Sequence, residues 1–209
     1  YADVVISAAD GYDTLYRMLE GKYVDNESAQ RFGSHPGSAT INRDASGRLF
    51  EPLLQVSIGV DRLLRETAQT VSHLIDRPIA IDDTHTATRL DATIYHFDST
   101  LAPSGKTAVT VRLRTDFDYW NRLAAEDAEQ FEEEKRRIGR EVVAALDSGT
   151  PPPDSGEGQG SGFVPRGPRI PGLAEAVEVI DVMTPVTLYR LTNNHRASIQ
   201  GWFPHPRTF

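Results

Sequence analysis

Hydrophobic and polar side chains alternate in three stretches of the middle of the chain, which is the pattern of a strand with one buried face. The apolar positions are Leu54, Val56, Ile58 and Val60, then Leu90, Ala92 and Ile94, then Val109, Val111 and Leu113. Residues 98–106 (DSTLAPSGK) contain the Pro and Gly of a chain reversal, so the last two stretches are predicted to form an antiparallel hairpin. A later apolar stretch, residues 177–182 (VEVIDV), is predicted to be another strand.

Residues 121–146 carry apolar side chains at helical spacing. These are Ala124, Ala128, Phe131, Ile138, Val142 and Ala145, with Lys135 interrupting the stripe. The spacing predicts one long amphipathic helix that packs its apolar face on the sheet. On the other face Glu132 and Glu133 precede Arg136 and Arg137 by four residues, pairs worth about 0.2–0.5 kcal/mol each. The acidic run is therefore interpreted as a solvated surface, not as a metal site.

The chain opens with a continuous apolar run, residues 3–9 (DVVISAA), of the kind found in parallel strands buried on both faces. Asp10 is placed to cap a following helix, and Gly21 to end it in the left-handed conformation. The order is thus strand, then helix. Ser7, Ala8, Ala9 and Asp10 would then lie at the carboxyl end of the strand, where open α/β sheets bind ligands.

Two segments have the composition of irregular structure. Residues 25–48 form a connector with little periodicity, and residues 148–168 form a flexible insert rich in Gly, Pro and Ser. The insert contains GEGQGSG, but no strand precedes it, no helix follows it and no GK[ST] is present, so a phosphate loop is not indicated. The predicted fold class is α+β, with an antiparallel or mixed sheet and a covering helix.

Composition narrows the function. The 209 residues are 39% hydrophobic, enough for a core, and 30 acidic against 22 basic residues give a net charge of −8, which argues against nucleic acid as a partner. The absence of Cys excludes disulfides and thiolate chemistry, and the six His show no spacing typical of a metal site. No apolar run reaches the roughly 20 residues of a membrane-spanning helix. A cytoplasmic location is expected, with peripheral membrane contact left open.

Five stretches carry a family resemblance. In chain order they are ADVVISAADGYDTLYRMLEGKY, FEPLLQVSIGV, YHFDSTLAPSGKTAVTV, DFDYW and TPVTLYRLTNNHRASIQGW. Together they resemble the later part of FAD-dependent phytoene desaturase-like oxidoreductases, the group that includes carotenoid desaturases and isomerases. The likeness covers nearly the whole chain apart from the insert and some of the connector. It is specific for the superfamily and not for a substrate.

The resemblance implies a domain plan. Such proteins are similar to the amine oxidase and GDP-dissociation-inhibitor fold, in which a Rossmann-like FAD-binding domain is interrupted by a substrate domain. Residues 1–24 would be a returning strand and helix of the FAD-binding domain, 49–182 the substrate domain, and 183–209 the crossing back. Because the chain begins with Tyr1 inside an apolar segment, it is expected to be an excerpt of a longer protein. The pyrophosphate-binding GxGxxG of the family is not in it, so missing parts of the same chain would complete the FAD site.

The resemblance also implies site residues. The family pattern T-G-N-W-K-G-S-x-x-G-W is matched at Thr192, Asn194, Ser198, Gly201 and Trp202. Gly201 and Trp202 would contact the flavin, and the backbone of residues 7–10 would contact the adenosine part of FAD. Asn194, His195 and Arg196 would face the substrate, although His195 replaces an aromatic and adds polarity. Simpler roles stay open: a helix cap for Asp10, a surface cation for Arg196 and a core position for Trp202.

The implied function is FAD-dependent desaturation or isomerisation of a lipophilic, unsaturated, carotenoid-like substrate. No catalytic side chain is singled out, since the flavin ring itself accepts the hydride and the protein supplies orientation and a dry cavity. The chain alone would be inactive. The alternative is a non-redox binding module, because the same fold serves prenyl-escort proteins.

Overall fold

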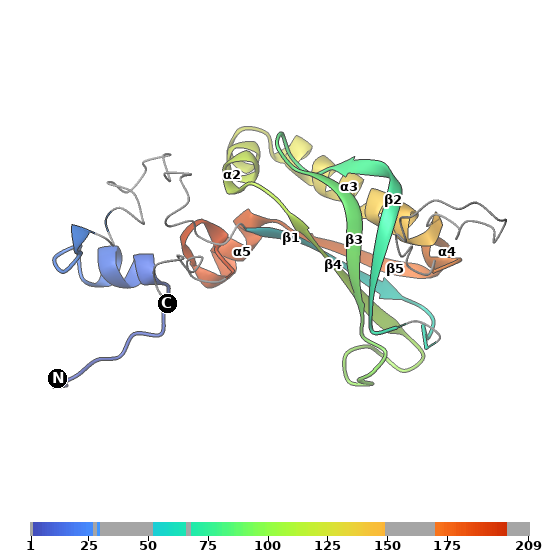
Figure 1. Ribbon diagram of the computed structural model, residues 1–209, viewed down its shortest axis with the longest axis horizontal. Helices are drawn as coiled ribbons and strands as arrows, with labels where there is room; N and C mark the ends of the chain where they lie inside the picture. The colour runs from blue at the N-terminus through green and yellow to red at the C-terminus, as the bar shows by residue number, and fades with distance from the viewer. Residues whose placement is uncertain (1, 27–28, 30–51, 66–67, 149–169, 200–209) are drawn as a thin grey trace, which may run out of the picture. The chain divides into compact units, whose positions relative to one another are not determined.

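The computed structural model describes residues 2–26, 29, 52–65, 68–148 and 170–199 (Figure 1). The chain divides into two compact units. The first unit combines Tyr1–Pro52 with Pro185–Phe209, and the second is Leu53–Thr184. Both ends of the chain therefore contribute to one unit, and the middle of the chain forms the other.

The second unit is built on a five-stranded antiparallel sheet with the strand order β2-β3-β4-β1-β5. The strands are β1 (Leu53–Val60), β2 (Thr70–Ala80), β3 (Thr86–Ile94), β4 (Thr107–Arg114) and β5 (Val177–Met183). The four predicted strands are confirmed as β1, β3, β4 and β5. The fold is mixed α+β, as the sequence predicts.

One face of this sheet, the inner face, carries the core. Pairing of β1 with β4 sets Leu54 opposite Leu113, and the same register continues through Val56 to Ile58. The apolar positions named from the alternation are at most 3% exposed on all three strands. Burial of one side chain in every two is what the period of a strand dictates. The predicted core positions of the sheet are confirmed.

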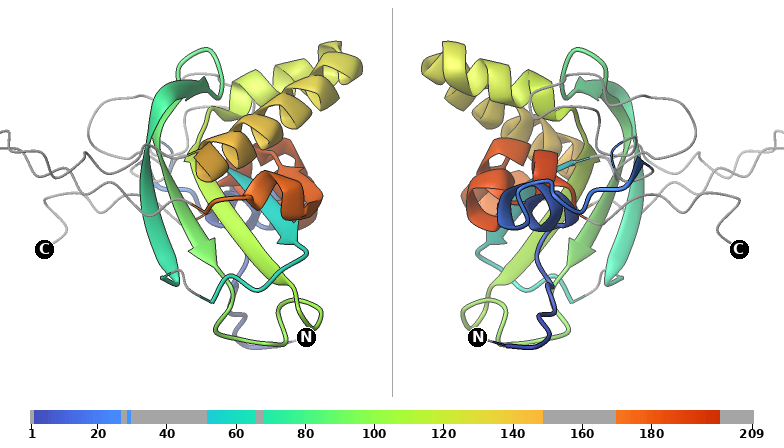
Figure 2. Two further views of the ribbon diagram at one scale, coloured as in Figure 1. Left: turned by 90° about the vertical axis from the view of Figure 1, so that its right-hand side faces the viewer. Right: turned by 90° about the vertical axis from the view of Figure 1, so that its left-hand side faces the viewer.

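Helices cover the inner face (Figure 2). The predicted single helix is two helices, α2 (Phe117–Glu126) and α3 (Ala128–Ser148), because Asp127 is extended between them at φ −147°, ψ 91°. Its carboxylate accepts a hydrogen bond from the Gln130 amide at 2.9 Å and so caps α3. Gly139 lets α3 approach β5, since a Cβ there would lie 2.8 Å from Cγ2 of Ile180. The short helix α4 (Leu173–Ala176) precedes β5.

The charged face of α3 is solvated, as expected, but its ion pairs differ from the predicted ones. Lys135 pairs with Glu132, and Arg137 pairs with both Glu134 and Glu141. On a helix surface, a charged side chain can pair with a partner either three or four residues away, and the sequence does not show which pair forms.

The edge strand β2 was not predicted. Its sequence, TVSHLIDRPIA, has adjacent apolar residues and a proline, and its register against β3 shifts between Leu74 and Ile79. Such an irregularity breaks the alternation that identifies a strand, and proline is tolerated at a sheet edge where one side of the strand is unpaired.

The strand predicted at residues 3–9 is wrong. These residues have no strand structure, and Val4, Val5 and Ile6 are 77%, 84% and 90% exposed. A parallel strand exists only beside hydrogen-bonded neighbours, and no other strand lies beside this run in the described residues. A helix does follow, but η1 (Asp13–Met18) is a π-helix and not the expected α-helix. Asp10 accepts hydrogen bonds from two amides at its start, and Gly21 is left-handed at φ +72°.

After the second unit, the described part of the chain forms α5 (Pro185–Thr192) and the single turn η2 (His195–Ala197). Several expectations lie outside the described residues: most of the connector 25–48, the insert apart from Ser148, and Gly201 with Trp202. Within the described ranges, no helix combines the length and the hydrophobicity needed to cross a bilayer.

Candidate functional site

The first predicted site segment, residues 7–10, leads into the helix of the first unit. Ser7 Oγ lies 2.7 Å from Thr14 Oγ1, and Ala8 and Ala9 are exposed. Asp10 Oδ1 accepts hydrogen bonds from the amides of Tyr12 and Asp13 at 2.9 and 3.2 Å. Two amides at the start of this helix are thus already satisfied within the chain. Contact of the backbone of residues 7–10 with the adenosine part of FAD stays a prediction.

The second predicted site segment, residues 194–196, lies at η2. Asn194 Nδ2 donates to the carbonyl of Ser198 at 3.0 Å, and Arg196 has the left-handed φ of 53°. The His195 ring stacks on Tyr12, with 4.0 Å between centroids and 16° between planes. Burial, with the positive charge of Arg196, lowers the pKa of His195 below its ordinary value, so the ring is neutral at neutral pH.

Contacts between distant segments join the two ends of the chain. Asp13 accepts a hydrogen bond from Asn193 Nδ2 at 2.7 Å and pairs with Arg17 at 3.2 Å. Arg17 in turn donates to the Tyr189 hydroxyl at 2.9 Å. Sequence reasoning missed this cluster, because the partners are separated by 172 and 180 residues and no local pattern links them. The cluster brings the predicted residues at 10 and 194–196 into one unit.

The second unit has an apolar hollow of about 350 Å³ on the outer face of the sheet, opposite the core. We call it the outer-face groove. Its lining combines outward side chains of β1, β4 and β5 with the hairpin loop, namely Ser57, Gly59, Ala108, Thr110, Val179 and Leu101 to Pro103. Leu101 and Val179 are 46% and 58% exposed, so they offer apolar surface to a ligand. A Cβ at Gly59 would lie 2.6 Å from Val179 Cγ1, so a larger residue there would displace the Val179 side chain and fill part of the floor.

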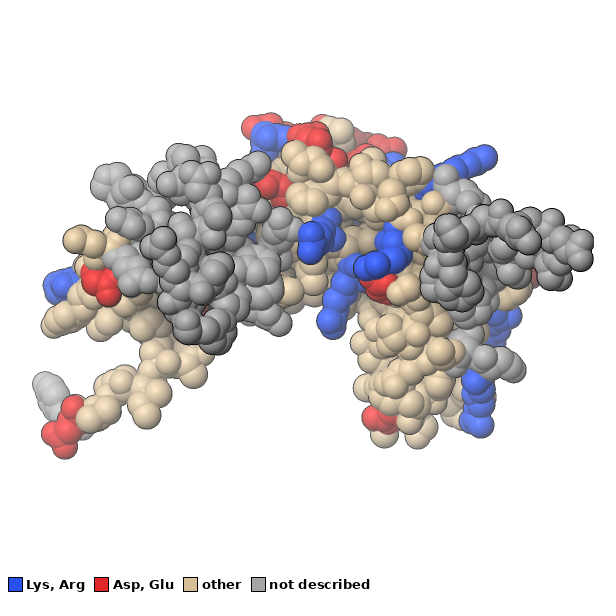
Figure 3. Space-filling model, viewed as in Figure 1, with Lys and Arg blue, Asp and Glu red and all other residues tan. Residues whose placement is uncertain are grey.

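Polar groups adjoin the groove along β1 and β4. Gln55 Nε2 donates to Ser57 Oγ at 3.2 Å, and Gln55 Oε1 accepts from Arg112 Nε at 3.2 Å. The Tyr95 hydroxyl lies 3.3 Å from Thr110 Oγ1. These side chains link the groove to an arginine on the same face. Figure 3 shows basic side chains over the strands of the sheet.

The β5 side of the groove has a different electrostatic character. Lys106 pairs with Glu178 and with Asp61, the latter at 3.4 Å, and these partners raise the pKa of Lys106. Asp181 lies opposite Ser57 in the pairing of β5 with β1 and is exposed. This side therefore offers a lysine paired with two carboxylates, and the exposed carboxylate of Asp181.

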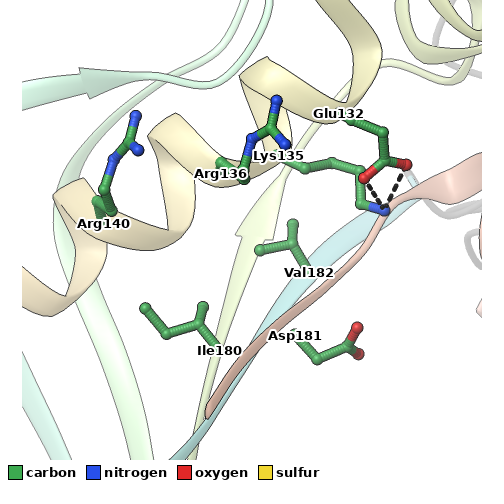
Figure 4. A pocket seen from close by; sticks show the side chains of 7 residues that line it. All are labelled: Glu132, Lys135, Arg136, Arg140, Ile180, Asp181 and Val182. Atoms are coloured by element: carbon green, nitrogen blue, oxygen red, sulfur yellow. Dashed lines mark hydrogen bonds and ion pairs between the residues drawn. The ribbon is translucent and has the colours of Figure 1, made fainter. Parts of the chain in front are cut away.

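A second hollow, of about 380 Å³, lies between α3 and β5 (Figure 4). It is lined by Glu132, Lys135, Arg136, Arg140, Ile180, Asp181 and Val182. Lys135 bridges to both carboxylate oxygens of Glu132, at 3.0 and 3.2 Å. Its charged lining fits an apolar ligand less well than the outer-face groove does.

Comparison with known proteins adds no identity. No protein-family model matches the sequence, and a search of curated proteins returns no significant match. Across the described ranges, no group of three or more His, Asp or Glu side chains is arranged to hold a metal ion.

Proposed function

We propose that the chain contributes the substrate domain, and part of the FAD-binding domain, of an FAD-dependent oxidoreductase of the phytoene desaturase type. Its substrate would be a lipophilic, unsaturated, polyene-like molecule that is desaturated or isomerised. The proposal follows the resemblance of the five quoted segments.

The observation that carries the proposal is the division of the chain. The unit Leu53–Thr184 interrupts a unit made of the segments before and after it. An interrupted cofactor domain with an inserted, helix-covered sheet is the plan that the resemblance implies. The hydrogen bond from Asn193 to Asp13 joins the two outer segments and supports the same plan.

The outer-face groove supports a lipophilic substrate. Its walls come from Leu101, Pro103 and Val179, and its floor is kept low by Gly59. A pocket with apolar walls and a few placed polar groups is the ordinary form of a small-molecule site. The volume accommodates part of a long polyene, so the rest of the molecule would extend beyond the groove.

In this proposal FAD is bound mainly by polypeptide outside the described residues. When bound, it would supply the hydride acceptor. The residues of this chain would orient the substrate and keep water from it.

The test uses the protein encoded by the whole reading frame that contains these residues. We expect it to purify with a flavin absorption spectrum that bleaches when a polyene is added without oxygen. The variant Thr110→Phe fills the groove and should keep the flavin but lose the bleaching. Thr93→Phe is the matched control, since Thr93 lies opposite Thr110 on the same face but does not line the groove.

One result would decide against the oxidoreductase, and another would decide against the groove as its substrate site. A protein that purifies without flavin and takes none up, yet still binds polyenes in the groove, would be a non-redox carrier of the escort kind. A flavoprotein whose bleaching is equally sensitive to both phenylalanine variants would place the substrate elsewhere.

A further inference from the structure

We infer that the ligand of the outer-face groove is amphipathic, with an acidic head group that Arg112 binds while the apolar tail occupies the groove. The inference rests on the proposed function in one respect, namely that the groove is the substrate site. It adds a substrate class that the sequence does not indicate.

The position of Arg112 relative to the groove is set by strand register. Thr110 lines the groove, and Arg112 follows it by two residues on the same face of β4. Two residues along a strand correspond to roughly 7 Å, which is within the reach of an arginine side chain. Gln55 lies directly opposite Arg112, as Ser57 lies opposite Thr110. The arginine therefore occupies the row of side chains next to the groove.

Hydrogen bonds orient this arginine. Gln55 holds the guanidinium through Arg112 Nε and uses its own amide nitrogen to bind Ser57 in the groove. The two terminal nitrogens of Arg112 have no partner among the described residues, and no carboxylate there lies within ion-pair distance of it. A guanidinium with two free parallel donors is suited to bidentate binding of a carboxylate.

The charges around the groove favour its Arg112 end as the place for an acidic group. Arg89, another exposed arginine of the same face, is paired with Asp91 at 3.0 Å. At the β5 side Lys106 is paired with Glu178, and Asp181 would repel an anion. Within the part of the chain that the structure describes, Arg112 is thus a cation beside the groove with no anionic partner. The ligand would lie with its head toward Arg112 and its tail toward Leu101 and Val179.

The experiment measures binding of a fluorescent conjugated fatty acid, cis-parinaric acid, and of its methyl ester to the 209-residue chain below their micellar concentrations. We expect the acid to bind about three- to tenfold more tightly than the ester, because the ion pair forms at an exposed position. Arg112→Leu should abolish this preference without weakening the ester, whereas Arg112→Lys should keep part of it.

The control is Arg140→Leu, which removes an exposed arginine from the hollow between α3 and β5. It should leave both affinities unchanged. Loss of the acid preference in Arg140→Leu, or its persistence in Arg112→Leu, would overturn the inference. Equal binding of acid and ester by the unmodified chain would also overturn it, while leaving the apolar groove and the proposed function intact. Failure of both ligands to bind would count against the groove itself.

Discussion

Asp82 anchors the turn between β2 and β3, and its replacement tests how the second unit is held together. Its side chain is fully buried and accepts hydrogen bonds from the amides and side chains of Thr84 and His85 at 2.8–2.9 Å. On the other oxygen it accepts from the Thr115 hydroxyl at 2.7 Å and from the Asp116 amide at 2.8 Å. One carboxylate thus joins the β2–β3 turn to the start of α2.

The magnitude follows from its pKa. Burial alone would raise the pKa of Asp82, but the hydrogen bonds from Thr115, Thr84, Asp116 and His85 outweigh it and hold the pKa at about 2, against an ordinary value of 3.8. A folded-state pKa below the unfolded one means that the stabilisation is present above pH 3.8 and is lost as the pH falls toward 2. The shift corresponds to roughly 2 kcal/mol of unfolding free energy.

The variant Asp82→Asn replaces one carboxylate oxygen by an NH2 group, which cannot accept the hydrogen bonds that this oxygen accepts. We expect it to lower the unfolding free energy at neutral pH by roughly 2–4 kcal/mol and to remove the acid-dependent part. Urea unfolding at several pH values measures both effects. Trp120 is the reporter, since its indole N–H donates to Thr115, which donates to Asp82. A Trp202→Phe background removes the second tryptophan of the chain.

Asp98→Asn provides the matched control. Asp98 makes the same bonds to a threonine two residues later, Thr100, but at an exposed loop. It should leave the unfolding free energy nearly unchanged, because its carboxylate is solvated. If Asp82→Asn behaves like Asp98→Asn and retains the acid sensitivity of the unmodified chain, the buried carboxylate does not anchor the turn.

Three further predictions concern packing, titration and the cofactor. Gly139→Val should lower the unfolding free energy of the second unit by about 1–3 kcal/mol, because a Cβ at this position meets Ile180. The control Ala144→Val, at an exposed position of the same helix, should not have this effect. Equal melting temperatures of the two variants would contradict the prediction. In an NMR pH series, His195 should titrate below its ordinary pKa. Tyr12→Ala uncovers the ring and should move the midpoint upward. An unchanged midpoint would mean that burial by Tyr12 does not cause the lowered pKa. The 209-residue chain should take up no FAD in equilibrium dialysis, because the GxGxxG that binds pyrophosphate in the family it resembles is not in it; a tightly bound yellow cofactor would refute this.

The sheet could be predicted from the sequence wherever each strand kept a strict alternation. Leu54 to Val60 and Val109 to Leu113 do so, and both lie in the interior of the sheet, where the inner face is fully covered. Strand β2 could not be predicted, because its register shift before Ile79 destroys the period. The break between α2 and α3 at Asp127 does have a signal in the sequence. An Asp followed three residues later by Gln is typical of a helix start, and it lies here within an otherwise continuous helical pattern.

The wrong strand at residues 3–9 has a different cause. An apolar run shows that a segment needs burial, but only neighbouring strands decide whether it becomes a strand. Val5 and Ile6 are among the most exposed hydrophobic side chains described. The same limit applies to the contact of Asp13 with Asn193, which depends on the path of the whole chain between them.

The sequence indicates which residues point to the outer face of the sheet, but it does not predict the groove that they form. Ser57 and Thr110 alternate with buried residues, so each was expected to point away from the core. That they are opposite one another, with Gln55 opposite Arg112, depends on the register between β1 and β4, which no local pattern specifies.

Register also determines how a ligand would lie. Moving β4 by one residue relative to β1 would turn Arg112 to the core face, away from the groove. Moving it by two would set Gln55 opposite Arg114 and place Arg112 opposite Ser57, within the groove itself. In the observed register the cation lies one row outside an apolar hollow, and Gln55 connects the two through its separate donor and acceptor. An apolar ligand would use only the hollow, whereas an amphipathic acid would use both, which is why the comparison of acid with ester discriminates between them.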